Sequence, residues 1–325
     1  MSTSQRNPLL LSARCAGVCY PRQADACLEY FRSFFAHPGG EEGLAPWEPD
    51  AEASLPAPRL IVTPHIDFRV SGRAYGHAFA PWVRRPAEAD CYVIVGVGHR
   101  AGLPWSLDGR DYATPLGTIP TAVPELLGIV AHTQQSGPPL PLGEAAAHVG
   151  EHSIEFPLVL LQALRKLRGI DRPFSFIPVL CGGMFPEVAA GLPPAPGSSA
   201  DRLADALRHL LGTLGPGRKV QVIVSIDGCH IGPRFDHAYR VGPGRLRACA
   251  AWEEELWQTV EQGDLAAFFA HLGKDRNARY FDGVGALTLM MKVFGPGLRL
   301  RRTHYEQWHT EADASAVTFT SGWAE

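Results

Sequence analysis

Three histidines each come just after a β-branched, apolar run of the kind that forms a buried strand: His65, His99 and His230. In an open α/β sheet, the carboxyl ends of the parallel strands meet at one edge, and ligands bind there. Core packing gives no reason for a histidine at three equivalent places. Because imidazole binds metals and exchanges protons near neutral pH, the pattern predicts a metal-binding or catalytic site at this edge.

Two further polar residues are expected at the same edge. Asp227 follows the third of these strands, and His152 opens a helix. Capping and the helix dipole are sufficient reasons for Ser153 and Glu155 in the first helical turn. They do not account for His152, because a cationic ring is disfavoured at a helix N-terminus. We therefore expect a neutral His152 that faces a metal or a substrate.

The elements that must position these residues alternate along the chain. Four runs are predicted to be buried strands: Arg59–Thr63, Cys91–Val97, Phe174–Leu180 and Lys219–Ile226. Four segments have the apolar spacing of helices: Ser153–Leu167, Ala200–Leu214, Gly244–Val260 and Val284–Val293. This alternation predicts an α/β fold with a mixed or mostly parallel sheet and helices on both faces. A late pair of strand-like runs, Leu298–Tyr305 and Ala316–Ser321, is expected to extend one edge.

Two stretches rich in proline and glycine are expected to be surface loops. They are Pro38–Pro58 and Gly191–Ser199. Strands and helices continue in one rhythm across both stretches, so neither separates two independent cores. The prediction is a single domain that spans residues 1–325.

Composition excludes several classes of function. The formal net charge of −3 leaves no basic surplus for nucleic acid, and no segment approaches the roughly 18 apolar residues of a membrane span. No secretory signal is recognisable at the N-terminus, so we expect a soluble, cytoplasmic protein. The seven scattered cysteines are then expected to be reduced thiols.

Short motifs along the chain resemble those of the Memo family, also called AmmeMemoRadiSam system protein B. The segments that carry the resemblance are AGVCY at Ala16–Tyr20, PHIDF at Pro64–Phe68, GVGH at Gly96–His99, EHSIE at Glu151–Glu155, IPVL at Ile177–Leu180 and SIDGCH at Ser225–His230. The family patterns are AGxWY, PHAGY, GPSH, EHSIE, IPVL and SSDFCH, and EHSIE is the most specific. The resemblance spans nearly the whole chain and implies a fold similar to that of class III extradiol dioxygenases.

The resemblance also implies a set of site residues. His65 and His99 match the two metal-binding histidines of the family, and Asp227 and His230 match polar residues of the same pocket. The third ligand of the family is usually a cysteine in a Cys-Gly-x-x-Pro stretch, and Asp282 stands at that position here. We therefore expect a metal ion bound by His65, His99 and Asp282. The alternative is that Asp282 caps the helix that follows it.

The aspartate changes the expected chemistry. Two histidines and a thiolate suit copper(I) or zinc, whereas two histidines and a carboxylate form the facial site of non-heme Fe(II) oxygenases. Fe(II) is the expected metal, with copper and zinc as alternatives. The expected function is that of a dioxygenase-like enzyme that acts on a small, phenolic substrate. His230 would act as acid/base, and Asp227 or His152 would orient it or stabilise oxygen-derived charge.

Other functions and partners stay open at this stage. One alternative is a zinc-dependent hydrolase, and another is a metal-binding redox, signalling or peptide-binding protein without turnover. The system name implies a functional link to a radical SAM protein, and a homodimer is compatible with the sequence. Asp67 either fixes a ligand histidine or bonds the local backbone. Arg279 and Tyr280 either line the pocket or bind an anionic substrate.

Overall fold

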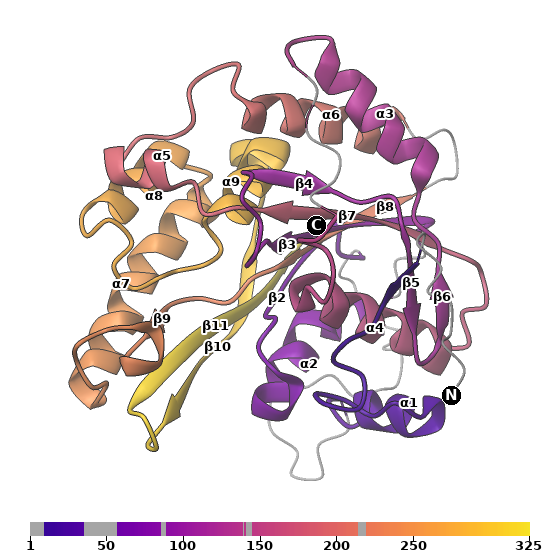
Figure 1. The fold of residues 1–325 in the computed structure, drawn as a ribbon, viewed down its shortest axis with the longest axis horizontal. Coiled ribbons are helices and arrows are strands. Elements are labelled where there is room, and N and C mark those ends of the chain that lie inside the picture. The colour runs from indigo at the N-terminus through magenta and orange to yellow at the C-terminus, as the bar shows by residue number, and fades with distance from the viewer. Residues whose placement is uncertain (1–9, 36–56, 86–88, 139, 141–144, 214–218) are drawn as a thin grey trace.

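The computed structural model describes residues 10–35, 57–85, 89–138, 140, 145–213 and 219–325 (Figure 1). Most of the predicted loop at Pro38–Pro58 lies outside these residues. The other predicted loop is present: residues 191–198 form no helix or strand, and a helix begins at Ser199.

A twisted central sheet runs through the molecule. Its strands are β2 (Leu60–Thr63), β3 (Cys91–Val97), β4 (Trp105–Leu107), β7 (Ser175–Cys181), β8 (Val220–Ser225), β9 (His230–Ile231), β10 (Arg301–Thr310) and β11 (Ser315–Ala324). The order is β10-β11-β2-β8-β3-β7-β4, and β9 pairs with β11 beside this path. The four predicted buried strands are the parallel centre, and the late pair extends one edge as an antiparallel hairpin. The expected mixed, largely parallel sheet is confirmed.

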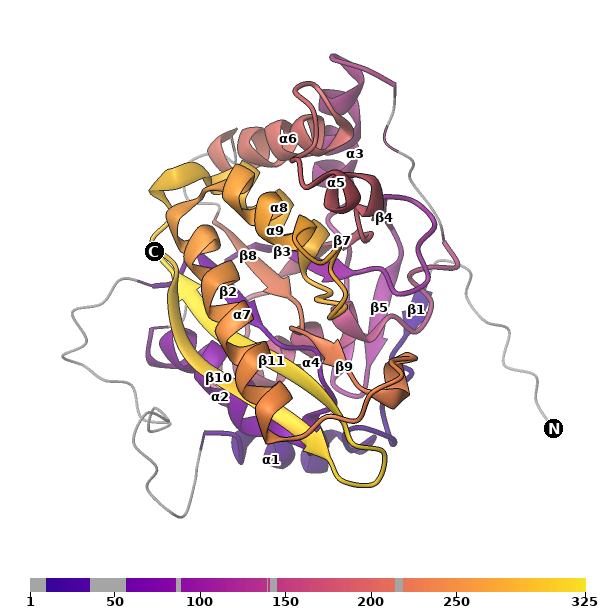
Figure 2. The ribbon, with the colours of Figure 1, turned by 90° about the vertical axis from the view of Figure 1, so that its left-hand side faces the viewer.

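Helices cover both faces of this sheet (Figure 1). One face carries α1 (Ala24–Arg32), α2 (Phe68–Arg84) and α4 (His152–Leu167). The other carries α3 (Val123–Gln134), α5 (Phe185–Ala190), α6 (Ser199–Thr213), α7 (Pro243–Gln262), α8 (Leu265–Gly273) and α9 (Val284–Phe294). Figure 2 shows α7 lying along the β10–β11 hairpin. Short 3-10 turns occur at Pro233–Phe235 and Gly295–Gly297.

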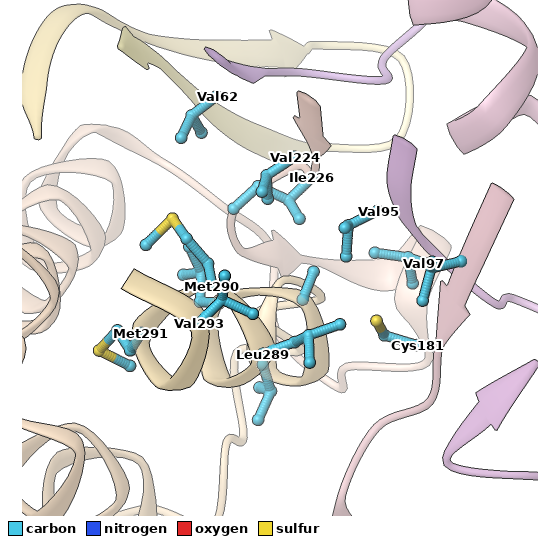
Figure 3. Close-up of a cluster of buried hydrophobic side chains, with 14 of the residues drawn as sticks. Val62, Val95, Val97, Cys181, Val224, Ile226, Leu289, Met290, Met291 and Val293 are labelled. Carbon is cyan, nitrogen blue, oxygen red and sulfur yellow. The ribbon is translucent and has the colours of Figure 1, made fainter. Parts of the chain in front are cut away.

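The strands are buried on both sides, which explains their continuous apolar sequence. Side chains alternate between the two faces: Leu60 and Val62 join the core under α9, whereas Ile61 joins the core under α4. Figure 3 shows how α9 packs on the sheet, with Leu289 and Met290 beside the strand valines. This packing fixes the N-terminus of α9 at the carboxyl edge of the strands.

The sequence patterns missed several elements. They did not predict α1, α2, α3, α5, α8 or the small separate sheet of β1 (Leu10–Ser12), β5 (Asp111–Thr114) and β6 (Gly117–Ile119). The helices that were predicted are present as α4, α6, α7 and α9, with no end shifted by more than two residues. None of the helices in the described part of the chain is long and apolar enough to span a membrane.

Candidate functional site

His65 lies directly beyond the end of β2 and is fully enclosed, with 1% of its surface exposed. Asp227, beyond the end of β8, holds this turn, because its Oδ1 accepts the backbone N–H groups of His65 (2.9 Å) and Ile66 (3.1 Å). The His65 Nδ1 lies 3.2 Å from the carbonyl oxygen of Ser225, which requires the proton on Nδ1. The Nε2 atom of His65 is therefore left to face the interior of the site.

Glu151 orients the second histidine. His99 lies beyond β3, and its Nδ1 is 3.0 Å from Glu151 Oε1, while its backbone N–H donates to Oε2 at 3.2 Å. The same carboxylate caps α4 by accepting the N–H of Ser153. Burial opposes ionisation of Glu151, but the bonds from His99 and Ser153 hold its pKa at about 2. A carboxylate that bonds the Nδ1 of a histidine is a common support for a metal ligand, because it leaves Nε2 free.

His152 completes a cluster of three imidazoles. Its ring stacks on His99 with 4.7 Å between ring centroids, and His65 meets both rings edge-on at 5.1 Å. Burial, together with the charges of His65 and His99, lowers the pKa of His152 to about 3. The ring is therefore neutral at pH 7, the form in which imidazole binds metals.

Asp282 brings a carboxylate to His65. Its Oδ2 is 3.1 Å from His65 Nε2, and the side chain is 12% exposed. The residue at the N-cap of α9 is Gly283, and no side-chain bond caps this helix. Neither carboxylate oxygen of Asp282 has a hydrogen-bond partner among the described residues, so the geometry does not support the alternative of a capping Asp282.

These donors form two overlapping groups that have the spacing of metal ligands. One joins His65, His99 and His152, and the other joins His65, Asp227 and Asp282. His65 Nε2 likewise lacks a hydrogen bond within the described residues. Burial alone would lower the pKa of His65, but the carboxylates of Asp227 and Asp282 raise it to about 10, so a metal ion at this place would displace the proton that these carboxylates otherwise favour on Nε2. Buried imidazole and carboxylate atoms that face each other without a hydrogen bond fit a cation, so the residues present suit a metal ion.

His230 stands at the margin of this cluster. Its Nδ1 lies 3.2 Å from the carbonyl oxygens of both Gly228 and Tyr280, and its backbone N–H donates to Arg279 at 2.8 Å. Burial raises the pKa of Asp227, and the nearby charge of His230 is one of the influences that oppose this rise. The backbone carbonyl groups of residues 279 and 280 therefore hold His230 in place through hydrogen bonds.

The side chains of Arg279 and Tyr280 make their contacts outside the candidate metal site. Arg279 pairs with Asp275 and lies over the ring of Trp252, and Tyr280 is 51% exposed beside His237.

Asp67 has the local role that the sequence left open. Its carboxylate caps α2 by accepting the N–H of Arg69 at 2.9 Å and also pairs with the Arg69 guanidinium. These bonds lower the pKa of Asp67 although burial opposes it. A role as partner of a ligand histidine finds no support in these contacts.

A second group of potential metal ligands includes Cys229, in the loop that carries Asp227 and His230. Cys229, Cys249 and Glu253 are all buried and within metal-ligand spacing. The Glu253 carboxylate already accepts hydrogen bonds from the hydroxyl groups of Thr318 (2.6 Å) and Tyr305 (2.7 Å) and from the backbone N–H of Cys229. We interpret this group as a hydrogen-bond network that ties the loop to α7 and the hairpin. All seven cysteines are free thiols.

The fold and the site together define a class of protein. It is an α/β protein with an extradiol-dioxygenase-like arrangement and a cluster of imidazoles and carboxylates around the buried His65, at the carboxyl edge of its strands. The model of the Memo-like protein family matches residues 12–322, and the chain belongs to that family. None of the curated proteins compared with the sequence matches it.

Proposed function

We propose that the chain is an oxygenase-like enzyme that uses non-heme Fe(II) and acts on a small, phenolic substrate. The observation that supports this proposal is the pair of buried donors without hydrogen bonds, His65 Nε2 and the Asp282 carboxylate, beside His99. Two imidazoles and a carboxylate are the ligands of facial Fe(II) sites, which keep open positions for O2 and substrate. A carboxylate at 282, in place of the cysteine usual in the family, favours iron over copper(I).

The remaining residues would handle protons around such a metal. When bound, Fe(II) would supply activation of O2 and a Lewis-acidic contact for a substrate oxygen. His230 is the proposed acid/base, because a proton on Nδ1 between two carbonyl oxygens leaves Nε2 as the acceptor. Asp227 would hold the His65 turn, and neutral His152 would contact substrate or oxygen-derived charge.

Metal analysis of protein purified without oxygen tests the first part. We expect about one iron per chain, its loss in His65→Ala, and a shift toward copper(I) or zinc in Asp282→Cys. His209→Ala, which changes an exposed histidine of α6, is the matched control and should keep its iron. Protein that takes up no Fe(II) would refute the proposal.

Oxygen consumption with catechol-like substrates tests the second part. Substitution of His230 by alanine should spare the iron and reduce turnover by about 10²–10⁴-fold, the usual contribution of a general acid/base. Loss of iron from His230→Ala would show that His230 is a ligand and not the acid/base.

A zinc-dependent hydrolase is the second candidate, and the three-imidazole group favours it. His65, His99 and His152 correspond in kind to the three histidines that hold catalytic zinc and leave one position for water. Turnover that continues without O2, with zinc in the purified protein, would establish this candidate in place of the oxygenase.

A further inference from the structure

Arg165 is a buried guanidinium without a carboxylate partner in the described part of the chain. It lies in the last turn of α4 and is 2% exposed. Its Nη1 donates to the hydroxyl of Tyr92 at 3.2 Å, its Nη2 donates to the carbonyl oxygen of Arg172 at 2.6 Å, and its plane covers the ring of Phe174. These neutral partners solvate the cation without neutralising it, and burying a charge costs several kcal/mol unless another charge compensates it.

Arg165 is one of the residues that line a cavity of about 290 Å³. The cavity lies between β6, the end of α4 and the segment that leads into β7. It lies beside the amino end of β7, whereas the candidate metal site lies beyond the carboxyl ends of the strands. A strand of seven residues spans about 20 Å, so the two sites are separate.

The charged groups of this cavity leave a positive surplus. Its lining includes Arg165, Lys166 and Arg172 but one acid, Asp171. Arg172 is neutralised by Asp90, which is not part of the lining. Arg165 and Lys166 make no ion pair with any acid of the described ranges. The guanidinium has five N–H donors, of which the described contacts account for two.

The helix dipole gives a partial explanation for these cations, because basic residues are favoured in the last turn of a helix. At this end of α4, however, the main chain already satisfies the terminal carbonyls. The N–H groups of Arg168, Gly169 and Ile170 donate to the carbonyls of residues 164, 165 and 166. Capping of the helix therefore does not explain why this guanidinium is buried without a counter-charge.

We propose that this cavity binds a small oxyanion of the phosphate type, held by Arg165 and Lys166. Guanidinium and ammonium donors bind phosphate oxygens through charge-assisted hydrogen bonds, and the anion would supply the missing negative charge. The apolar part of the wall, at Ile119, Pro173 and Phe174, would contact the carbon atoms of a small phosphate monoester.

Calorimetric titration with inorganic phosphate tests this site in the His65→Ala variant, so that anion binding at the candidate metal site is excluded. We expect saturable binding that weakens about tenfold or more in Lys166→Met and Arg165→Met, as expected for loss of a charge-assisted bond. Lys166 is exposed, so its substitution does not threaten the fold. Lys274→Met, on α8's C-terminal side and away from the cavity, is the matched control and should bind as before.

The source of the phosphate group is tested in the same experiment with glycerol phosphate. Tighter binding than that of inorganic phosphate would identify a monoester as the ligand, and equal binding would identify the free anion. Absence of saturable phosphate binding would overturn the proposal, as would an unchanged dissociation constant in Lys166→Met.

Discussion

At the scale of single residues, the site depends on two carboxylates that hold the candidate metal-binding histidines in place. Glu151 accepts hydrogen bonds from both the ring and the main-chain N–H of His99, and it also caps α4. Asp227 holds the turn at His65 by accepting the backbone N–H groups of His65 and Ile66. The His99 ring is thus oriented by the Glu151 carboxylate through a charge-assisted bond, whereas the His65 ring is oriented by the carbonyl oxygen of Ser225.

Replacement of Glu151 by glutamine should lower metal affinity by about 10–100-fold, the usual effect of losing such a partner. The amide keeps the size of the side chain but cannot supply the negative charge that fixes His99. The measurement is the dissociation constant for Fe(II) under anaerobic conditions, with Glu187→Gln on α5 as control. An unchanged constant would mean that His99 is held by its neighbours alone.

The sequence predicts which strands deliver His65 and His99, because both follow recognisable buried runs. It does not reveal the partner of His99, since a glutamate at a helix start already has a local explanation in capping. Ser153 and Glu155 are attributed by the sequence to capping and the helix dipole; both lie in the first turn of α4, but neither side chain caps the helix. The Ser153 hydroxyl donates to the carbonyl of Val97, where Gly96 leaves room for it: a Cβ at Gly96 would lie 2.6 Å from Ser153 Oγ.

At the scale of elements, α4 anchors the segment that precedes α1. Glu155 is fully buried and accepts the N–H groups of Arg14 (2.8 Å) and Cys15 (2.9 Å) and the hydroxyls of Tyr20 (2.7 Å) and Tyr112. Burial raises the pKa of Glu155, and the four donors oppose the rise. The second glutamate of the EHSIE motif is therefore a structural anchor.

Glu155→Gln should release this segment without removing the metal. The amide places donors where two N–H groups and two hydroxyls now point, so we expect a loss of about 2–3 kcal/mol in unfolding free energy. Limited proteolysis should show faster cleavage after Arg14, while iron content stays at the wild-type level. Parallel loss of iron would show that the segment is part of the metal site.

A second link joins α2 to the hairpin. Ser71 has a non-helical φ of −152° inside α2, and its hydroxyl donates to Glu306 of β10 at 2.7 Å. Glu306 also meets His304 at 3.0 Å. Burial opposes ionisation of Glu306, but these bonds lower its pKa below the ordinary 4.5. The kink and the hairpin are therefore held together by an ionised carboxylate.

This link should be sensitive to acid. A carboxyl with a lowered pKa in the folded state adds stability above its ordinary pKa, and that stability is lost as pH falls from about 4.5 through the folded value. Glu306→Gln should lower the unfolding free energy by about 1 kcal/mol at pH 7, since the side chain is partly exposed and screened. Chemical denaturation at pH 7 and pH 4 should show the difference shrinking with acid, and an unchanged difference would contradict the assignment.

The kink also explains why α2 was not predicted. Its sequence contains Ser71, Gly72 and Pro81, which interrupt the regular helical spacing of apolar residues. The helix forms because tertiary packing overrides these weak local preferences, with Tyr75 and Phe79 buried against the sheet. The strands of the small sheet have three or four residues each, too short for a period to be recognised.

At the scale of the whole molecule, the two cores share the same strands. Leu60 and Val62 belong to one core and Ile61 to the other, so the loss of either helical layer would expose one apolar face of β2. The candidate ligands add a second connection, because His65, His152 and Asp282 come from β2, α4 and the N-terminus of α9. These features support the proposal that residues 1–325 form one domain.

One domain of this kind should unfold in a single transition that metal binding shifts as a whole. Far-UV circular dichroism and tryptophan fluorescence should give the same midpoint, because the tryptophans lie on both sides of the sheet: Trp82 in one core and Trp257 in the other. Fe(II) at 100 times its dissociation constant should add about 2.7 kcal/mol to stability, and should add nothing in His65→Ala. Two separate midpoints would show that the layers unfold independently, and a shift of only one midpoint by Fe(II) would place the metal in that layer alone.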